Sequence, residues 1–253
     1  MQEHTCYMLF FIGLGIWDEK DLSIKALETL KGCNIVFAET YTSELRPNVF
    51  KRLEKIIQKK ITILGREQVE DGKIILAKAK NKKVALITPG DPFIASTHIS
   101  LKLDAEKQKI KTKILHAQSI YTSAISESGL QLYKFGRPCS LSFWSEHYKP
   151  TSTLEVILEN MRSGLHTIVF LDIKERCMEP KEALELLLEI QKAKNTKEID
   201  NVLVISRLGS DEQTIRYGNI KTLLINDLGK PPSLLIIPGK LHFMEEEALR
   251  QFQ

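Results

Sequence analysis

A glycine-rich turn follows the first apolar run of the chain. Residues 13–18 read Gly-Leu-Gly-Ile-Trp-Asp, at the place where many α/β proteins bind the phosphates of a nucleotide. Asp18 stands where the dinucleotide fingerprint has its third glycine, and Glu19 and Asp21 follow closely. Three carboxylates repel a pyrophosphate at a helix start, whereas they stabilise the helix dipole. The turn therefore disfavours NAD and FAD, and a tight strand-to-helix turn that needs small residues explains it equally well.

A second candidate loop closes a predicted strand at residues 88–92, which read Thr-Pro-Gly-Asp-Pro. Two prolines around a Gly-Asp pair fix the backbone path, and rigid loops of this kind hold ligands well. Asp91 can accept hydrogen bonds from a ribose or an ammonium group, and residues 94–98 can line an adenine slot beside it. An ordinary turn in which Asp91 makes an Asx bond is the alternative.

Further candidates lie where other predicted strands end. Ser119 lies in the segment 116–121, at a predicted domain junction, where open α/β sheets place their ligand crevice. Its hydroxyl can bond a ligand or cap the helix that follows. Residues 170–172 and 206–209 end two strands of the second half. They can contact a ligand or simply belong to the hydrophobic core.

Signatures of several other chemistries are missing from the sequence. It has no GKS or GKT of a P-loop, no GxSxG elbow, no HExxH and no His/Cys/Asp cluster close in sequence, so no metal site is expected. His98, His116 and His166 are isolated along the chain, which favours structural roles. Methyl transfer from a sulfonium fits this pattern, because it needs mainly alignment and exclusion of water. The sequence identifies no general base, and an acceptor amine can lose its proton to water.

Two α/β domains, residues 1–116 and 117–253, are expected to position these segments. In the first, short apolar runs alternate with helical patterns, which is typical of a sheet with helical crossovers. In the second, residues 208–213 are too short a connection for a crossover, so the strands that they join are expected to be antiparallel in a mixed sheet. The expected strands are residues 9–14, 35–38, 61–64, 84–88, 113–116, 140–144, 167–172, 202–207, 214–217 and 234–237. The expected helices begin near Ile24, at Pro47, and at residues 73, 97, 119, 152 and 180.

Composition indicates a soluble globular protein of 253 residues, with 43% hydrophobic and 27% charged residues. The net charge of +4 is too mild to indicate a nucleic-acid or membrane partner. The apolar stretch 8–17 is well short of the roughly 20 residues that span a bilayer. The cysteines lie far apart, without metal-ligand spacing, at positions Cys6, Cys33, Cys139 and Cys177. They are expected to be reduced thiols of a cytoplasmic protein.

An ordered set of motifs resembles one enzyme family. The blocks are residues 8–22, 39–43, 89–98, 129–136, 164–174 and 238–242. Each block is weak alone, but their order closely resembles the methyltransferases of diphthamide biosynthesis, within the tetrapyrrole-methylase-like class of S-adenosylmethionine-dependent enzymes. The resemblance runs from Met8 to about residue 247.

The resemblance implies two α/β domains with a cofactor cleft between them, and a homodimer. It also implies that S-adenosylmethionine is converted to S-adenosylhomocysteine while the amino group of a modified histidine on translation elongation factor 2 is methylated successively. Residues 131–144 look more like eukaryotic members, which add a fourth methyl group to the carboxylate and give the methyl ester.

The resemblance also implies cofactor contacts, with Asp91 serving the polar part of the cofactor and apolar side chains walling the adenine and the sulfur. Carried over position by position, these contacts fall on Ile16, Asp91, Ile94, Ser119, Ile120, Leu171, Leu208 and Ser233. Ser233 stands where relatives often have histidine, so a ring contact to the cofactor is expected to be missing.

Two alternatives differ from this hypothesis. The first is a sister methyltransferase that acts on a tetrapyrrole or on ribosomal RNA. The second is a non-catalytic binding module that keeps the α/β scaffold and docks on a translation factor. Intact Gly13, Gly15, Asp91 and Ser119 disfavour this loss of function.

Overall fold

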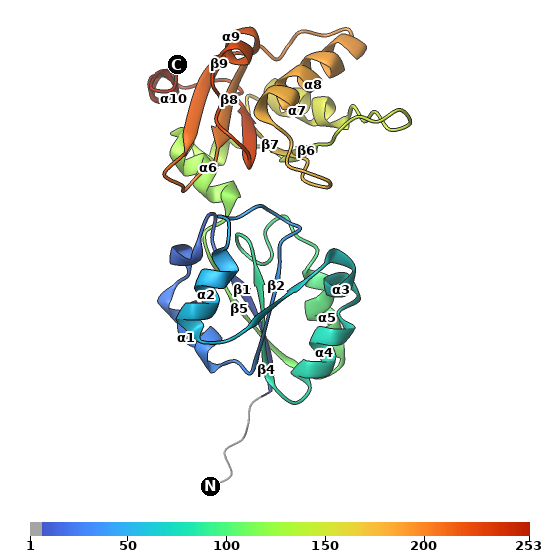
Figure 1. Ribbon diagram of the computed structural model, residues 1–253. Coiled ribbons are helices and arrows are strands. Elements are labelled where there is room, and N and C mark those ends of the chain that lie inside the picture. Colours follow the sequence, from blue (N-terminus) through green and yellow to red (C-terminus); the bar gives the residue numbers. More distant parts are fainter. Residues whose placement is uncertain (1–6) are drawn as a thin grey trace. The chain divides into compact units, whose positions relative to one another are not determined.

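The chain forms two compact α/β units, described over residues 7–253 by a computed structural model (Figure 1). The first unit extends to Ile120, and the second runs from Tyr121 to Gln253. The division thus falls slightly after the boundary expected at 116/117. Residues 117–120 stay with the first unit, where the Ala117 N–H donates to Asp91 Oδ2 at 3.3 Å. Cys6 lies outside the described residues.

The sheet of the first unit has five parallel strands in the order β3-β2-β4-β1-β5. The strands are β1 (Met8–Gly13), β2 (Ile35–Glu39), β3 (Ile61–Leu64), β4 (Lys83–Thr88) and β5 (Lys111–Leu115). The helices are η1 (Glu19–Asp21, 3₁₀), α1 (Ile24–Gly32), α2 (Val49–Ile57), α3 (Arg66–Asp71), α4 (Lys73–Ala79) and α5 (Ile99–Lys107). Because the strands are parallel, the carboxyl ends of β4, β1 and β5 are neighbours at one edge, where open α/β sheets bind ligands.

Both faces of this sheet are buried. Helices α1 and α2 cover one face, and α3, α4 and α5 cover the other (Figure 1). On the first face Leu30 and Leu53 pack in one cluster with Ile12, and on the second Ile75 and Leu101 pack with Phe11. Burial on both faces explains why the three central strands, β2, β4 and β1, are nearly continuous apolar runs in the sequence.

The sheet of the second unit is mixed, with the order β6-β7-β10-β8-β9. The β6/β7 pair is parallel and the other pairs are antiparallel. Its strands are β6 (Cys139–Leu141), β7 (Thr167–Leu171), β8 (Asn201–Ser206), β9 (Thr214–Asn219) and β10 (Ser233–Ile237). Its helices are α6 (Ile120–Ser128), η2 (Leu132–Lys134, 3₁₀), α7 (Ser152–Arg162), α8 (Pro180–Ala193), α9 (Ile220–Ile225) and α10 (Phe243–Arg250). Apolar side chains of α7, α8 and α9 form one core cluster with this sheet.

The two expected α/β layers, all ten strands and the antiparallel β8/β9 pair are confirmed. Three details differ. The strand expected at 140–144 ends at Leu141, because the chain turns away and the Trp144 indole donates to the Pro150 carbonyl at 3.1 Å. The helix expected to open at Pro47 begins at Val49, after Asn48 in the left-handed region. Helices α3, α9 and α10 were not expected; all are short. No helix between residues 7 and 253 is long and apolar enough to cross a membrane.

Candidate active site

Loops after β1 and β4 pair with each other at the carboxyl edge of the first sheet. Gly15 and Gly90 form an isolated bridge, in which the Gly90 N–H donates to the Gly15 carbonyl at 2.8 Å. The Leu14 N–H continues the ladder by donating to the Thr88 carbonyl at 2.9 Å. The two candidate loops that the sequence indicates are therefore one structure.

Glycine is required where these loops approach each other. A Cβ atom on Gly13 would lie 2.5 Å from the Gly90 carbonyl oxygen and 2.7 Å from the Ala117 Cβ. Gly15 has a φ of +101°, and a Cβ there would lie 2.2 Å from the Asp21 Cβ. The three loops after β1, β4 and β5 are thus packed to within van der Waals contact of one another.

The turn after β1 is closed by its own carboxylate. Asp21 Oδ2 accepts hydrogen bonds from the N–H groups of Ile16 at 3.1 Å, Trp17 at 2.7 Å and Asp18 at 3.3 Å. Asp18 in turn accepts from the Lys20 N–H at 2.9 Å and caps η1. Consecutive N–H groups of this kind would otherwise be free to bind a phosphate. Their occupation supports the interpretation that the turn is unsuited to a pyrophosphate.

Asp91 ties the β4 loop to the segment after β5. Its Oδ1 accepts from the Phe93 N–H at 3.2 Å, and its Oδ2 accepts from the Ala117 N–H at 3.3 Å. His116 Nδ1 lies 2.7 Å from the same Oδ2. The Asp91 side chain is 8% exposed, whereas that of His116 is 71% exposed. His116, isolated in sequence, is therefore one half of a carboxylate–imidazole pair in the fold.

A buried polar cluster lies at the end of β2. Glu39 Oε2 accepts from the Tyr41 N–H at 2.9 Å, and its Oε1 lies 3.8 Å from His98 Nε2. Burial raises the pKa of Glu39, although the Thr42 hydroxyl, His98 and backbone N–H groups oppose the shift. Burial and the nearby Glu39 raise the pKa of Tyr41 to about 12.

This cluster also reaches the β4 loop. His98 Nδ1 lies 3.0 Å from the Pro92 carbonyl oxygen and so donates to it, which leaves Nε2 facing Glu39. His98 is also not isolated in the fold. It connects β2 to the loop that carries Asp91. Local sequence patterns do not reveal this contact, because His98 and Glu39 are far apart along the chain.

The expected cofactor contacts divide between the two units. In the first unit all five follow β1, β4 or β5: Ile16, Asp91, Ile94, Ser119 and Ile120. Asp91 and Ser119 are buried, Ile16 is half-buried and Ile94 is 49% exposed. The first unit therefore gathers these residues at one edge of its sheet.

In the second unit the three remaining residues also share a sheet edge. Leu171 ends β7, Leu208 follows the end of β8, and Ser233 begins β10, which is antiparallel to both strands. Ser206 Oγ donates to the Leu228 carbonyl at 2.7 Å, so the Ser233 hydroxyl, 2.8 Å away, donates to Ser206. The Ser233 hydroxyl thus has a partner in its own unit.

Three of the sequence motifs of the second half contribute to a buried polar cluster around Glu245. This cluster lies at the opposite end of β7 and β10 from Leu171 and Ser233. His166 Nδ1 accepts from the Gly239 N–H at 2.9 Å, so its Nε2 carries the proton and donates to Glu245 Oε1 at 3.0 Å. Glu245 Oε2 also pairs with Lys134. Burial lowers the pKa of His166, although Glu245 partly offsets the shift. These residues join the blocks 129–136, 164–174 and 238–242 and serve the fold.

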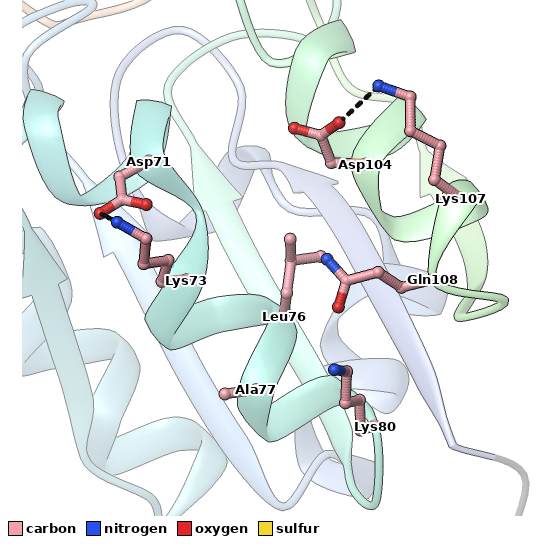
Figure 2. Close-up of a pocket in the computed structure, with 8 residues that line it drawn as sticks. All are labelled: Asp71, Lys73, Leu76, Ala77, Lys80, Asp104, Lys107 and Gln108. Atoms are coloured by element: carbon pink, nitrogen blue, oxygen red, sulfur yellow. Dashed lines mark hydrogen bonds and ion pairs between the residues drawn. The ribbon is translucent and has the colours of Figure 1, made fainter.

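A surface pocket of about 540 Å³ lies elsewhere on the first unit, along α4 and α5 (Figure 2). Lys73 pairs with Asp71 at 3.0 Å, and Lys107 pairs with Asp104 at 2.9 Å. None of the expected cofactor contacts lines it. Across residues 7–253 no group of three or more His, Cys, Asp or Glu side chains could hold a metal ion.

Comparisons with known proteins assign this architecture. A profile described as tetrapyrrole (corrin/porphyrin) methylases matches residues 8–224. The chain belongs to this family of methyltransferases.

Relatives and solved structures narrow the assignment. Diphthine synthase of Methanococcus maripaludis strain C5 is 42% identical, over 96% of this chain and 98% of its own. Diphthine synthase of Methanocaldococcus jannaschii is 41% identical over the same shares. A crystal structure of a diphthine synthase superposes with a TM-score of 0.89 at 34% identity, covering 97% of this chain and 95% of its own. Within the methylases the chain belongs to the diphthine synthases, which makes it an S-adenosylmethionine-dependent methyltransferase of diphthamide biosynthesis.

Proposed function

We propose that the chain transfers methyl groups successively from S-adenosylmethionine to the amino group of a modified histidine on translation elongation factor 2. The observation that carries the proposal is the pair of touching loops after β1 and β4, in which Asp21 fills the turn that a phosphate would need. Such a site favours a nucleoside cofactor without phosphate, and the names of the relatives favour this acceptor.

The residues of the first unit fit that cofactor. Thr88 Oγ1 at the end of β4 is buried and, within residues 7–253, has no hydrogen-bond partner. Asp91, three residues further on, accepts one hydrogen bond at Oδ1 and two at Oδ2, so one lone pair of Oδ1 is left for a ribose or an ammonium group. A cofactor with several polar atoms and a flat adenine ring, whose face an apolar side chain can cover, suits this edge, where Ile94 is half exposed.

We assign the cofactor contacts to Ile16, Asp91, Ile94, Ser119 and Ile120 of the first unit and to Leu171, Leu208 and Ser233 of the second. Asp91 serves the polar part, and the apolar side chains wall the adenine and the sulfur. The bound cofactor supplies an activated methyl group on a sulfonium. The chain's residues then need to hold the acceptor nitrogen in line with that methyl group and to exclude water.

The wider assignment rests on the sequence composition and on the resemblance of the sequence motifs. The enzyme is proposed to act as a cytoplasmic homodimer with a protein acceptor and no nucleic acid. A fourth methyl group on the acceptor carboxylate, giving the methyl ester, belongs to the same proposal.

Mass spectrometry of elongation factor 2 after reaction tests acceptor and methyl number together. Factor that carries the unmethylated intermediate is expected to gain up to three or four methyl groups in the presence of S-adenosylmethionine. Asp91→Ala is expected to weaken cofactor binding, measured by calorimetry, while the far-ultraviolet spectrum stays unchanged. Methylation of a tetrapyrrole or ribosomal RNA instead would establish the sister activity. Absence of any melting-temperature increase with millimolar cofactor would contradict the proposal.

A further inference from the structure

Asp91 and His116 form a carboxylate–imidazole pair at the carboxyl edge of the first sheet. An ionised carboxylate only accepts hydrogen bonds, so the 2.7 Å contact requires the proton on His116 Nδ1. In the neutral imidazole Nε2 then carries the free lone pair. The imidazole is 71% exposed, while the carboxylate that orients it is 8% exposed.

The orientation of this imidazole is set through Asp91. Asp91 is itself held by the Phe93 N–H at 3.2 Å and the Ala117 N–H at 3.3 Å. Ala117 packs against Gly13, and a residue larger than glycine at position 13 would collide with the Ala117 side chain. His116 thus stands on the same edge as the proposed cofactor contacts of the first unit, although its sequence context suggested only a structural role.

The reaction needs a proton acceptor. An amino group is an ammonium ion at neutral pH and has no lone pair with which to attack a methyl group. Each round of methylation must remove one proton before attack, and three rounds release three protons. A positioned base typically accelerates such a transfer by 10²- to 10⁴-fold.

We infer that His116 is the general base of the amine methylations and that Asp91 positions it. This inference rests on the proposed function. His116 Nε2 takes a proton from the acceptor ammonium, giving a neutral amine and an imidazolium. The amine lone pair forms the new N–C bond while the C–S bond breaks, and sulfur keeps the electron pair as a neutral thioether. The exposed imidazolium then returns its proton to water, which readies it for the next round.

The test compares His116→Asn with the wild type in single turnovers on elongation factor 2 carrying the unmethylated intermediate. Asparagine can keep an N–H directed at Asp91 but offers no imidazole lone pair. We expect the methyl-transfer rate to fall at least about 100-fold, with cofactor affinity by calorimetry and melting temperature within error of the wild type. His147→Asn, an exposed histidine of the β6–α7 loop, is the matched control and should keep the wild-type rate.

Chemical rescue separates a base from a structural role. His116→Gly with added imidazole is expected to recover at least about tenfold in rate, because free imidazole supplies the missing lone pair. A His116→Asn rate within threefold of the wild type would overturn the inference, as would a slow His116→Gly that imidazole does not restore while both variants bind cofactor normally. Failure of the wild type to methylate the factor would instead contradict the proposed function.

Discussion

Asp21 Oδ2 lies 2.7 Å from the backbone nitrogen of Trp17 and closes the first glycine turn from within the chain. Two neighbouring N–H groups, of Ile16 and Asp18, point at the same oxygen. In nucleotide-binding proteins such groups are left open for a phosphate. Here they are satisfied before any ligand arrives, which fixes the backbone at Ile16, an expected cofactor contact.

Asp21→Ala is therefore expected to damage both stability and cofactor binding. Loss of a charged acceptor for three N–H groups should lower the free energy of unfolding by about 2–3 kcal/mol, measured by urea titration. Cofactor affinity should fall by about tenfold, which corresponds to about 1.4 kcal/mol, because the turn that holds Ile16 loosens. Asp71→Ala, which removes only an exposed pair with Lys73, is the control and should change stability by less than about 0.5 kcal/mol. Normal cofactor affinity in the destabilised Asp21 variant would argue against a contact at Ile16.

Gly13→Ala tests the close approach of the loops after β1 and β4. The added methyl group would lie 2.5 Å from the Gly90 carbonyl oxygen, so the backbone of one loop must move. We expect a loss of about 1–3 kcal/mol in stability and a clear loss of cofactor affinity by calorimetry. Gly32→Ala is the matched control, because it ends α1 with nothing within 4 Å of the new methyl group. It should be neutral or stabilising by up to about 1 kcal/mol. Equal effects of the two changes would contradict the packing argument.

Local patterns in the sequence were enough to predict most of the fold. The alternation of apolar runs and helical stretches located the strands, because burial on both faces leaves a strong signal in a run such as 84–87. Helix α3 at Arg66–Asp71 has a single buried residue, Val69, and so leaves almost no apolar periodicity. Trp144 was expected in a strand because it is apolar, but its indole hydrogen bond holds it in a loop.

The candidate site was predictable only in part. Gly13 and Asp91 stand out because turn residues follow apolar strands. The residues that pair with the histidines cannot be found in this way, since Asp91 is 25 residues from His116 and Glu245 is 79 residues from His166. Contacts between residues so far apart in the sequence depend on the order of the strands in the sheet. Local patterns in a single sequence do not reveal that order. The expected contact at Ser233 stays a prediction, with a hydroxyl that already binds Ser206.

Glu245 is expected to make the second unit sensitive to acid. Burial alone would raise the pKa of this carboxyl, but hydrogen bonds from Lys134 and from the Gln131 and His242 N–H groups outweigh it and lower the pKa from 4.5 to about 2. A lowered folded-state pKa stabilises the protein above pH 4.5, and this contribution is lost as the pH falls from there towards 2.

Glu245→Gln should therefore lower the free energy of unfolding at pH 7 by about 3 kcal/mol and flatten its decline between pH 4.5 and 2. Urea titrations of the wild type and the variant across that range measure both effects. Glu246→Gln, at a neighbouring and exposed position of α10, is the control and should follow the wild-type curve. An unchanged slope in the Glu245 variant would show that another group controls the acid sensitivity.

Methylation of the acceptor carboxylate offers a separate check on His116. A carboxylate oxygen carries a lone pair at neutral pH, so its attack on the methyl group releases no proton and needs no base. On elongation factor 2 whose amine already carries three methyl groups, His116→Asn should slow ester formation far less than it slows amine methylation. Mass spectrometry follows both reactions. The rate of ester formation divided by the rate of amine methylation should be about 100-fold higher in the variant than in the wild type. Equal slowing of both reactions would indicate that His116 positions the acceptor, and absence of ester with the wild-type enzyme would limit its product to the trimethylated amine.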